Sequence, residues 1–464
     1  MHSFRKLFGL CAPLALIKAS WRLAMALLLL LAASSTDALA SPSSVASAVA
    51  GAFLANQTNF LNWEGGFQYG GAVVADGLYE AQAQFGGLAW TAAADHWSDA
   101  YLAGPPDNRT TFDCSASFPY GAANNTKTCA WQLRHNVSID HGGTIGDHVA
   151  LFPIAYLHRR LRLLAAGKAA SGAAYDADMA VLSSAARQYV LGWPTRLSDG
   201  TVARGGAAPG DRCLWADDQF MGLALVSRLA AAPRALDPSG RYLPDELKAE
   251  LASFAATQQL SFSRRMRDAT DGLYYHGVFV AEDASGAETF APSCCKWGRA
   301  NGWGMLSHVE VLQALEAQPQ QPHPQHAQVL ADYQARAAAM LDFQDPQSGR
   351  WRQVVNESST YLETSSTAMA LTSLATGVRR GWLASAAVMP AIEAAWAGLA
   401  QTVDLTSGVV SGVCMGTGIM PNASGYNSRG TDFFQSSPGG VGTVLRAAAA
   451  VAKLHESRAQ KLES

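Results

Sequence analysis

The sequence is poor in charged residues. Only 15% of its 464 residues are Asp, Glu, Lys or Arg, and the formal net charge at pH 7 is −3. Because no basic run occurs away from the N-terminus, we expect neither nucleic acid nor an anionic membrane surface as a partner. The metal-binding patterns CxxC and HExxH are also missing. We therefore expect no structural zinc site, and no pattern calls for a cofactor.

Long apolar runs are missing except near the N-terminus. There LAMALLLLLAA, residues 23–33, follows several basic side chains and is too short to span a bilayer. The small residues ALA at 38–40 form a cleavage site. These features predict a secretory signal peptide over residues 1–40 and a mature domain over residues 41–464. We expect that domain to be secreted, outside the cell or in the cell wall, without membrane attachment after cleavage.

Cysteine is scarce. Of the seven cysteines, one lies in the predicted signal peptide, and the spacing of the others assigns few partners. Cys114 and Cys129 flank a polar loop and are the pair that we expect to form a disulfide. Six Asn-X-Ser/Thr sequons agree with secretion and N-glycosylation. They begin at Asn56, Asn108, Asn124, Asn136, Asn356 and Asn422.

Apolar residues make up 49% of the chain, which is enough to bury a large core. Ala- and Leu-rich stretches of helical period alternate with loops rich in Gly, Asp, Pro and Trp. Neither a Pro/Ser linker nor a fixed-period repeat divides the chain. The pattern predicts a single all-α domain of about twelve helices, paired as six hairpins and closed into an (α/α)6 barrel. The helices are expected near residues 43–56, 70–86, 88–102, 144–166, 176–192, 215–231, 243–266, 302–316, 323–343, 364–379, 387–402 and 438–456.

Several conspicuous loops precede the first helix of a predicted hairpin. Such loops meet on one face of a ring of hairpins, which is where we expect an active site. Short strands are expected beside them at 272–280 and 351–355, where aromatic and β-branched residues alternate. The loops are IDHGGTIGDH, CLWADD, CCKWGRANGW and YLETSST.

The motif WADDQFMGLAL places Asp217 and Asp218 between Trp215 and an apolar helix. One reading is structural, because carboxylates at a helix start accept hydrogen bonds from free N–H groups and meet the positive dipole end. The other reading is catalytic. A cap needs only one Asp, and a carboxyl turned into an aromatic-lined cavity has its pKa raised by burial and by like charge. Such a carboxyl can donate a proton near neutral pH.

The segment SIDHGGTIGDH offers a second carboxylate, Asp140. A metal site would need several ligands that converge, and the flexible Gly pair gives no fixed spacing, so we expect no metal here. The structural alternative is a Gly-rich turn near a helix start. The functional alternative is that Asp140 lies in the same mouth as Asp217.

Two further motifs carry aromatic and cationic side chains. GLYYHGVF contains His276, which on its own is more typical of a structural histidine. CCKWGRANGWGML contains Trp297, Arg299 and Trp303 on a loop that enters a helix near residues 301–302. Tryptophan faces bind the apolar face of a sugar ring, and arginine binds a carboxylate with two parallel hydrogen bonds. This combination favours an acidic sugar as the ligand.

Together these motifs resemble those of the unsaturated rhamnogalacturonyl hydrolases, glycoside hydrolase family 105, and of the related unsaturated glucuronyl hydrolases of family 88. The resemblance runs in the family's order over roughly residues 130–450. It implies an (α/α)6 barrel that removes a 4,5-unsaturated uronic acid from the non-reducing end of lyase-generated oligosaccharides, by hydrating the double bond. The matching stretches are WADDQFM, YYHGVF, KWGRANGWGML, ETSSTAMALTSLATGVRRGWL and VCMGTGI.

The resemblance implies roles for the site residues. Asp217 is the expected general acid and base, Asp140 the second carboxylate. The unsaturated sugar and its carboxylate are the expected ligands of His276, Trp297, Arg299, Trp303 and Trp215.

The sequence departs from the family at one point. Many members carry a GFWH-like run before the WxD motif, whereas this chain has DGTVARGGAAPGDR, with Arg204 and no histidine. We therefore count Arg204 among the substrate-binding candidates and expect a preference for a different sugar or linkage.

Two alternatives remain on the residues alone. One is a conventional inverting α/α-barrel glycosidase with two separated carboxylates. The other is a carbohydrate-binding protein without turnover. The sequence assigns no oligomeric state.

Overall fold

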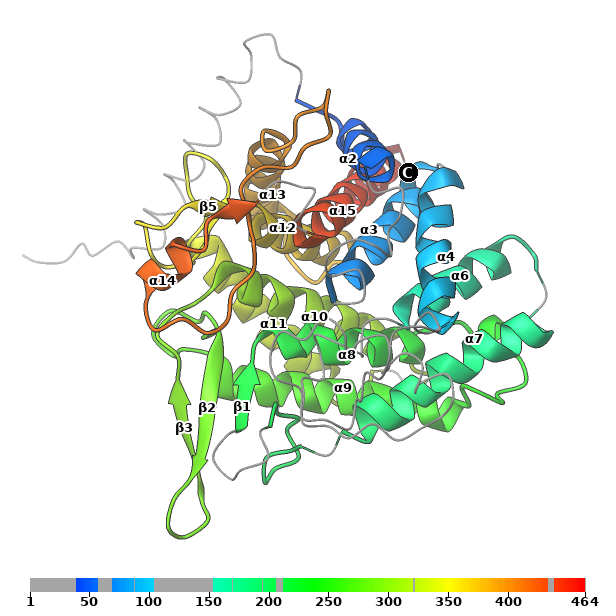
Figure 1. The fold of residues 1–464 in the computed structure, drawn as a ribbon, viewed down its shortest axis with the longest axis horizontal. Helices are drawn as coiled ribbons and strands as arrows, with labels where there is room; N and C mark the ends of the chain where they lie inside the picture. The colour runs from blue at the N-terminus through cyan, green and yellow to red at the C-terminus, as the bar shows by residue number, and fades with distance from the viewer. Residues whose placement is uncertain are drawn as a thin grey trace, which may run out of the picture.

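The helices of the molecule are arranged around a common axis as two concentric rings (Figure 1). Asp140, the Cys114–Cys129 pair and residues 1–38 of the predicted signal peptide lie outside the part of the chain that the computed structural model describes. That part comprises residues 39–56, 69–86, 88–103, 153–168, 170–193, 195–205, 212–319, 322–432 and 438–463.

Most of the inner helices are buried on nearly all sides, because they are surrounded by their ring neighbours and by outer helices. In α12, every residue from Thr364 to Val378 is buried. Contacts run from α8 to α10, α12, α15 and α3, and α6 packs against α3. The inner helices are α3 (Tyr69–Phe85), α6 (Ile154–Ala165), α8 (Asp217–Ala230), α10 (Gly298–Glu316), α12 (Thr364–Arg379) and α15 (Pro438–Glu463).

The outer helices bury only one face. In α9 the buried Leu247, Leu251 and Ala255 recur every four residues, as expected for a helix with one apolar stripe. The outer helices are α2 (Pro42–Asn56), α4 (Leu88–Ala103), α7 (Ala173–Ser184), α9 (Asp245–Met266), α11 (His326–Asp342) and α13 (Ser385–Ala400). Short helices in the connections are η2 (Ala185–Leu191), η3 (Arg234–Leu236) and α14 (Ala423–Asn427). The arrangement confirms the predicted (α/α)6 barrel. Within the described residues, no helix has the length and apolar character needed to cross a membrane.

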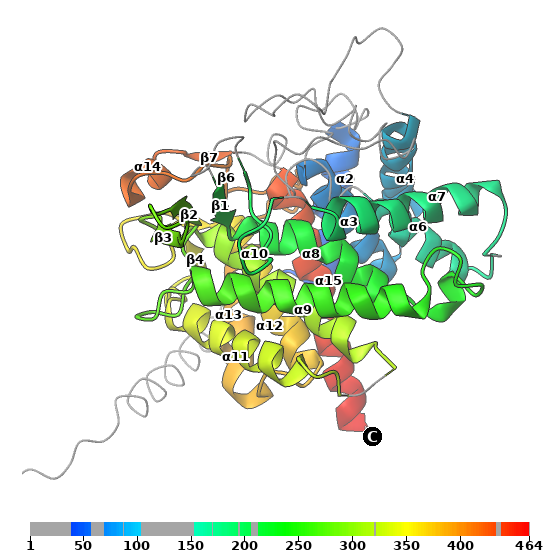
Figure 2. The same cartoon turned by 90° about the horizontal axis from the view of Figure 1, so that it is seen from below.

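Short strands and α14 lie at one end of the barrel, and the C-terminus of α15 lies at the other (Figure 2). The three-stranded antiparallel sheet consists of β1 (Arg212–Trp215), β2 (Gly277–Glu282) and β3 (Glu288–Pro292). Two smaller pairs are β4 (Trp351–Arg352) with β5 (Leu362–Glu363), and β6 (Val413–Cys414) with β7 (Thr431–Asp432). In the register of β1 and β2, Trp215 pairs with Gly277, which brings the WADD and YYHG motifs side by side.

Helix α10 begins earlier than the sequence indicates. The expected start near residue 302 is wrong, since the helix starts at Gly298 with Trp297 as its N-cap residue. The glycines that looked like loop residues are needed for close packing. A Cβ atom at Gly298 would lie 2.6 Å from the carbonyl oxygen of Arg352, and one at Gly302 would lie 2.7 Å from the sulfur of Met369. Tertiary packing therefore outweighs the low helix propensity of glycine here.

Candidate active site

The two adjacent aspartates open α8 at the end of the barrel that carries the strands. Ala216, not an aspartate, occupies the N-cap position, and its side chain makes no capping hydrogen bond. Asp217 and Asp218 are the first two residues of the helix, where their charges meet the positive end of the helix dipole. Both aspartates therefore lie in the first helical turn, as the structural reading allows, but neither fills the N-cap position.

Asp218 is committed to a buried ion pair. Its two carboxylate oxygens accept hydrogen bonds from Nε and Nη2 of Arg204, each at 2.8 Å. The two side chains are only 3% and 5% exposed, and the Arg204 guanidinium lies 4.0 Å from the ring centre of Trp215. Arg204, a substrate-binding candidate in the sequence, thus holds the neighbour of the candidate acid.

Asp217 faces a different partner. Its Oδ2 atom lies 3.5 Å from Nε2 of His276, a distance longer than a formed hydrogen bond. Both atoms are inaccessible to solvent and have no hydrogen-bond partner among the described residues. Buried polar atoms without partners are uncommon, and a catalytic role is one explanation for two of them facing each other. The side chain of Asp217 as a whole is 10% exposed, so solvent still reaches its other edge.

His276 is fixed on several sides. Its ring centre lies 4.9 Å from that of Trp215 and 4.6 Å from that of Trp297. Its backbone N–H donates to the carbonyl of Cys295 (2.9 Å), and its carbonyl accepts from the N–H of Ala216 (3.0 Å). The histidine is therefore anchored directly to the residue that precedes Asp217.

Arg299 is almost completely buried in the first turn of α10. Its Nε donates to Oγ of Ser365 (2.9 Å), and its Nη2 donates to the carbonyl of Cys414 and lies 3.8 Å from the carboxylate of Glu363. Burial disfavours the charged form, but Tyr69, Cys414 and Glu363 outweigh it and raise the pKa of Arg299. The site therefore contains a permanent cation close to the ring of Trp297.

The ETSS segment caps α12, with Glu363 as the N-cap residue. The carboxylate accepts from the backbone N–H groups of Ser365 (3.2 Å) and Ser366 (2.6 Å). It also accepts from the N–H of Cys414 (2.9 Å). Glu363 thus joins the start of α12 to strand β6 and places a negative charge beside Arg299.

The tryptophans of the site are packed within the protein. Trp297 is 2% exposed and donates from Nε1 to Gln353 (3.1 Å), whereas Trp303 is 1% exposed and stacks on Phe220 with ring centres 4.9 Å apart. No partner for the Trp303 Nε1 is found among the described residues. The structure brings Asp217, His276 and the three tryptophans, with Arg204 and Arg299, to the starts of α8 and α10.

Three features of the site were missed by sequence reasoning. Tyr426 from α14 places its hydroxyl 2.7 Å from Nδ1 of His276, and no motif marked it. Glu363 begins the stretch ETSSTAMALTSLATGVRRGWL but was not singled out as a site residue. Cys294 and Cys295 form a disulfide between neighbouring residues just before Trp297, where their adjacency was the only indication.

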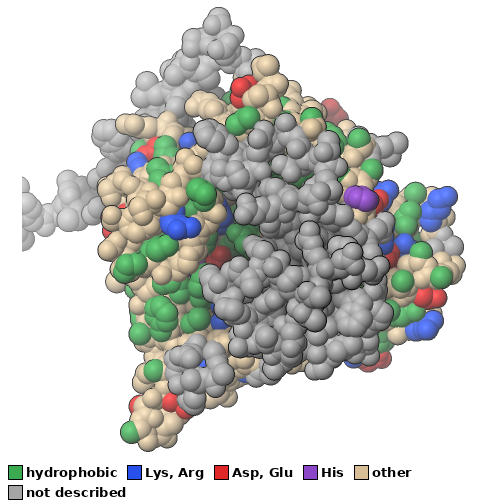
Figure 3. All heavy atoms as spheres, in the orientation of Figure 1, with side chains coloured by type: hydrophobic (Ala, Val, Ile, Leu, Met, Phe, Trp, Pro, Cys, Tyr) green, Lys and Arg blue, Asp and Glu red, His purple; other side chains and the backbone are tan. Residues whose placement is uncertain are grey.

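The surface near this end of the barrel carries hydrophobic groups. Figure 3 shows such side chains between α14 and the strands β2 and β3. Phe279 and Phe290 in these strands are 49% and 41% exposed.

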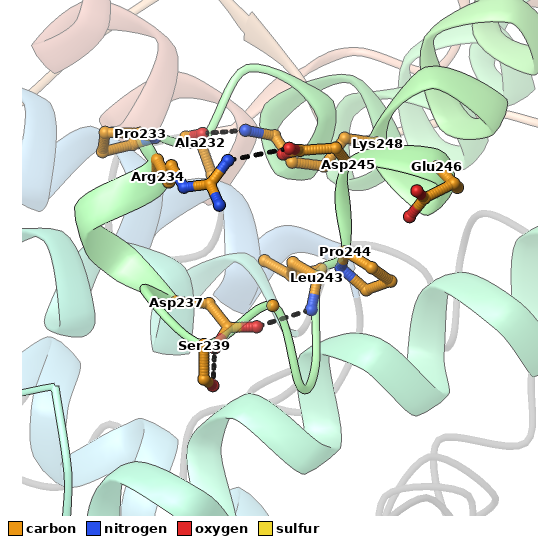
Figure 4. A pocket seen from close by; sticks show the side chains of 11 residues that line it. Ala232, Pro233, Arg234, Asp237, Ser239, Leu243, Pro244, Asp245, Glu246 and Lys248 are labelled. Atoms are coloured by element: carbon orange, nitrogen blue, oxygen red, sulfur yellow. Dashed lines mark hydrogen bonds and ion pairs between the residues drawn. The ribbon is translucent and has the colours of Figure 1, made fainter.

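A hollow, drawn in Figure 4, lies at the end of α8 opposite to Asp217. It is formed by the connection from α8 to α9, where Lys248 donates to the carbonyl of Ala232 and Arg234 pairs with Asp245. Since α8 has 14 residues and is about 20 Å long, this hollow is remote from Asp217. Its lining contains no aromatic ring, so it lacks the groups that bind a sugar face.

Residues 172–455 match the model of glycosyl hydrolase family 88. The chain belongs to this family. The matched region contains Asp217, His276, Arg299 and Tyr426, whereas Asp140 precedes it. The predicted membership is confirmed.

A known hydrolase is similar in sequence to part of this chain. The unsaturated rhamnogalacturonyl hydrolase YesR of Bacillus subtilis (strain 168) is 29% identical over 162 residues, which are 35% of this chain and 41% of that protein. The match thus spans less than half of the relative's length.

Two solved structures share the fold. A family 105 glycoside hydrolase of C. acetobutylicum ATCC 824 superposes with a TM-score of 0.62 at 16% identity, covering 88% of this chain and 98% of that one. The unsaturated glucuronyl hydrolase of Bacillus sp. GL1 gives a TM-score of 0.57 at 13% identity, covering 87% and 96%.

Proposed function

We propose that this family 88 protein removes a 4,5-unsaturated uronic acid from the non-reducing end of oligosaccharides made by polysaccharide lyases. The observation that carries the proposal is the pair of buried atoms on Asp217 and His276, at the start of an inner barrel helix, that have no hydrogen-bond partner among the described residues. The likeness to YesR supports an unsaturated rhamnogalacturonyl substrate.

The reaction that suits this site is hydration of the double bond. Asp217 transfers its proton to C4 of the unsaturated ring while the oxygen of a water molecule bonds to C5. The water gives up a proton to the Asp217 carboxylate, which restores the acid. The resulting hemiketal opens spontaneously and releases the neighbouring sugar. One positioned carboxyl thus acts as both acid and base, a role worth on the order of 10²–10⁴-fold in rate.

Recognition of the uronate falls to Arg299 in this proposal. Its charge is retained because Tyr69, Cys414 and Glu363 outweigh the effect of burial, so it attracts the sugar carboxylate at any working pH. Trp215, Trp297 and Trp303 border the sugar ring, and His276, whose ring nitrogens face Asp217 and Tyr426, supports the acid beside them. Asp140 supplies the second carboxylate. Arg204 acts on the sugar indirectly, through Asp218 and Trp215.

The decisive test uses a panel of lyase-generated oligosaccharides, followed by loss of the ultraviolet absorbance of the double bond. In deuterated water the product should gain deuterium at C4, because hydration delivers a solvent-derived proton there. Saturated oligosaccharides of the same composition are the control and should not react. Cleavage of saturated substrates without C4 labelling would instead establish a conventional glycosidase, and binding without turnover would establish a carbohydrate-binding protein.

The same proposal places the protein in the secretory pathway. The apolar segment at residues 23–33 and the sequons support secretion of a chain that begins near Ser41. N-terminal sequencing of the native protein tests this. A soluble native protein that retains residues 1–40 and carries no N-glycan would contradict it.

A further inference from the structure

Tyr426 is a buried residue of the site that the proposed reaction does not use. It belongs to α14, a short helix in the connection between α13 and α15, and its side chain is completely inaccessible to solvent. Its hydroxyl lies 2.7 Å from Nδ1 of His276, which is normal hydrogen-bond geometry. The opposite ring nitrogen of His276 is the one that faces Asp217. Tyr426, His276 and Asp217 therefore form a line.

The hydroxyl of Tyr426 acts as the donor in this contact. Burial, together with the charge of Asp217, raises the pKa of Tyr426, so the phenol stays protonated. A buried hydroxyl proton needs an acceptor, and Nδ1 of His276 is the one acceptor within hydrogen-bond distance of this hydroxyl among the described residues. The hydroxyl proton is then left for Nδ1 of His276. A neutral imidazole that accepts at Nδ1 carries its own proton on Nε2.

We propose that Tyr426 is a positioning residue, which fixes His276 in the tautomer whose Nε2–H points at Oδ2 of Asp217. The catalytic consequence rests on the function proposed above, whereas the tautomer does not. With Oδ2 turned toward the imidazole N–H, the transferable proton of Asp217 sits on Oδ1, the other edge of the carboxyl. In the opposite tautomer a lone pair of Nε2 would face Oδ2, so Asp217 would be held protonated toward the histidine.

The connection that carries Tyr426 is seated firmly enough for this role. The carbonyl of Tyr426 accepts from Nε2 of Gln353 (3.3 Å), and the side chain of Asn422 caps α14 by accepting from the N–H of Gly425 (2.9 Å). A Cβ atom at Gly277 would lie 2.2 Å from Ile419, so the connection packs directly against the residue after His276. The segment that carries the Tyr426 hydroxyl is thus fixed at Ile419, at the start of α14 and at the Tyr426 carbonyl.

The test is Tyr426→Phe, with Tyr275→Phe as the matched control. Each variant loses one hydroxyl and keeps its ring. Tyr275 precedes His276 in the sequence, but its hydroxyl donates to Asp268 (2.6 Å) and not to the imidazole of His276. Nitrogen-15 spectra of histidine-labelled full-length protein report the tautomer, and His276→Gln assigns the signal. The remaining spectrum verifies that each variant is folded.

We expect the Nε2–H tautomer in the parent protein and in Tyr275→Phe, and a shift toward the Nδ1–H form in Tyr426→Phe. On unsaturated oligosaccharides, kcat of Tyr426→Phe should fall about tenfold or more, while KM changes by less than about threefold. The same tautomer and the same kcat in Tyr426→Phe as in the parent would overturn the proposal. A parent that converts none of the substrates would contradict the proposed function instead, and the spectra would still decide the tautomer.

Discussion

The neighbours Asp217 and Asp218 should respond oppositely to the same substitution. Asp217→Asn should abolish most turnover and leave stability nearly intact, whereas Asp218→Asn should destabilise the fold and retain more activity when it is folded. Asparagine keeps the shape of the side chain in both cases and removes only the charge and the acid. The two variants therefore separate catalysis from structure at consecutive positions of one helix.

The magnitudes follow from the partners of each carboxylate. Asp218 makes two hydrogen bonds of 2.8 Å to Arg204, and both side chains are at least 95% buried. Removing one partner of a buried pair leaves an uncompensated charge and costs about 3–5 kcal/mol. Asp217 loses only its interaction with the helix dipole, which is worth about 0.3–1 kcal/mol. Its turnover should fall on the order of 10²–10⁴-fold, because it is the proposed general acid.

Urea unfolding followed by tryptophan fluorescence measures the stability of each variant, and activity is assayed at a temperature where all are folded. Arg204→Met is the reciprocal variant. The pair Arg204→Met with Asp218→Asn should cost less than the sum of the single changes, because no buried charge is then left alone. The reasoning fails if Asp217→Asn stays active or if Asp218→Asn is as stable as the parent.

Three further predictions concern other parts of the molecule. Arg299→Lys keeps the charge but loses the planar fork, so KM for unsaturated uronides should rise in steady-state assays; an unchanged KM would refute a carboxylate contact. The carboxylate of Asp332 makes a hydrogen bond of 2.8 Å with Nε2 of His308. Burial alone would raise the pKa of Asp332, but this hydrogen bond outweighs burial and lowers the pKa from 3.8 to about 2. The contribution of Asp332 to stability is thus complete above about pH 4 and lost as the pH falls through 2. In Asp332→Asn the unfolding free energy should therefore fall less steeply with pH between about 4 and 2 than in the parent. An equally steep fall would exclude this role. In a secreted product, mass spectrometry should find more glycan on exposed Asn422 than on half-buried Asn356, whose amide donates to a carboxylate; the reverse order would contradict this.

The fold was predictable because the helices carry their own periodicity. Residues 364–379 were expected as a helix and are α12, and the helix expected over 243–266 is α9, Asp245–Met266. The ring of hairpins was predictable because about twelve helical stretches follow one another with neither a linker nor a fixed-period repeat between them. The placement of WADD and KWGRANGW at inner-helix starts also follows from the order of the hairpins.

The contacts within the site were not predictable, because they depend on pairings between distant segments. Trp215 and Gly277 are opposite each other in a sheet whose first strand has only four residues, Arg212–Trp215. The early start of α10 depends on close packing against Met369, which no local propensity contains. Tyr426 reaches His276 from 150 residues away. The roles in substrate binding of Arg204, Arg299 and the tryptophans stay predictions.

The geometry of a helix start explains why two adjacent carboxylates are useful here. Consecutive residues of an α-helix point about 100° apart, so Asp217 and Asp218 address different surroundings. Arg204 neutralises Asp218, which removes most of the like-charge repulsion that Asp217 would otherwise feel. Asp217 can then gain and lose a proton without disturbing the buried ion pair beside it. Asp218 thus holds Arg204 beside the proposed acid, so the loss of Asp218 should lower the stability of the fold first and reduce turnover only as a consequence.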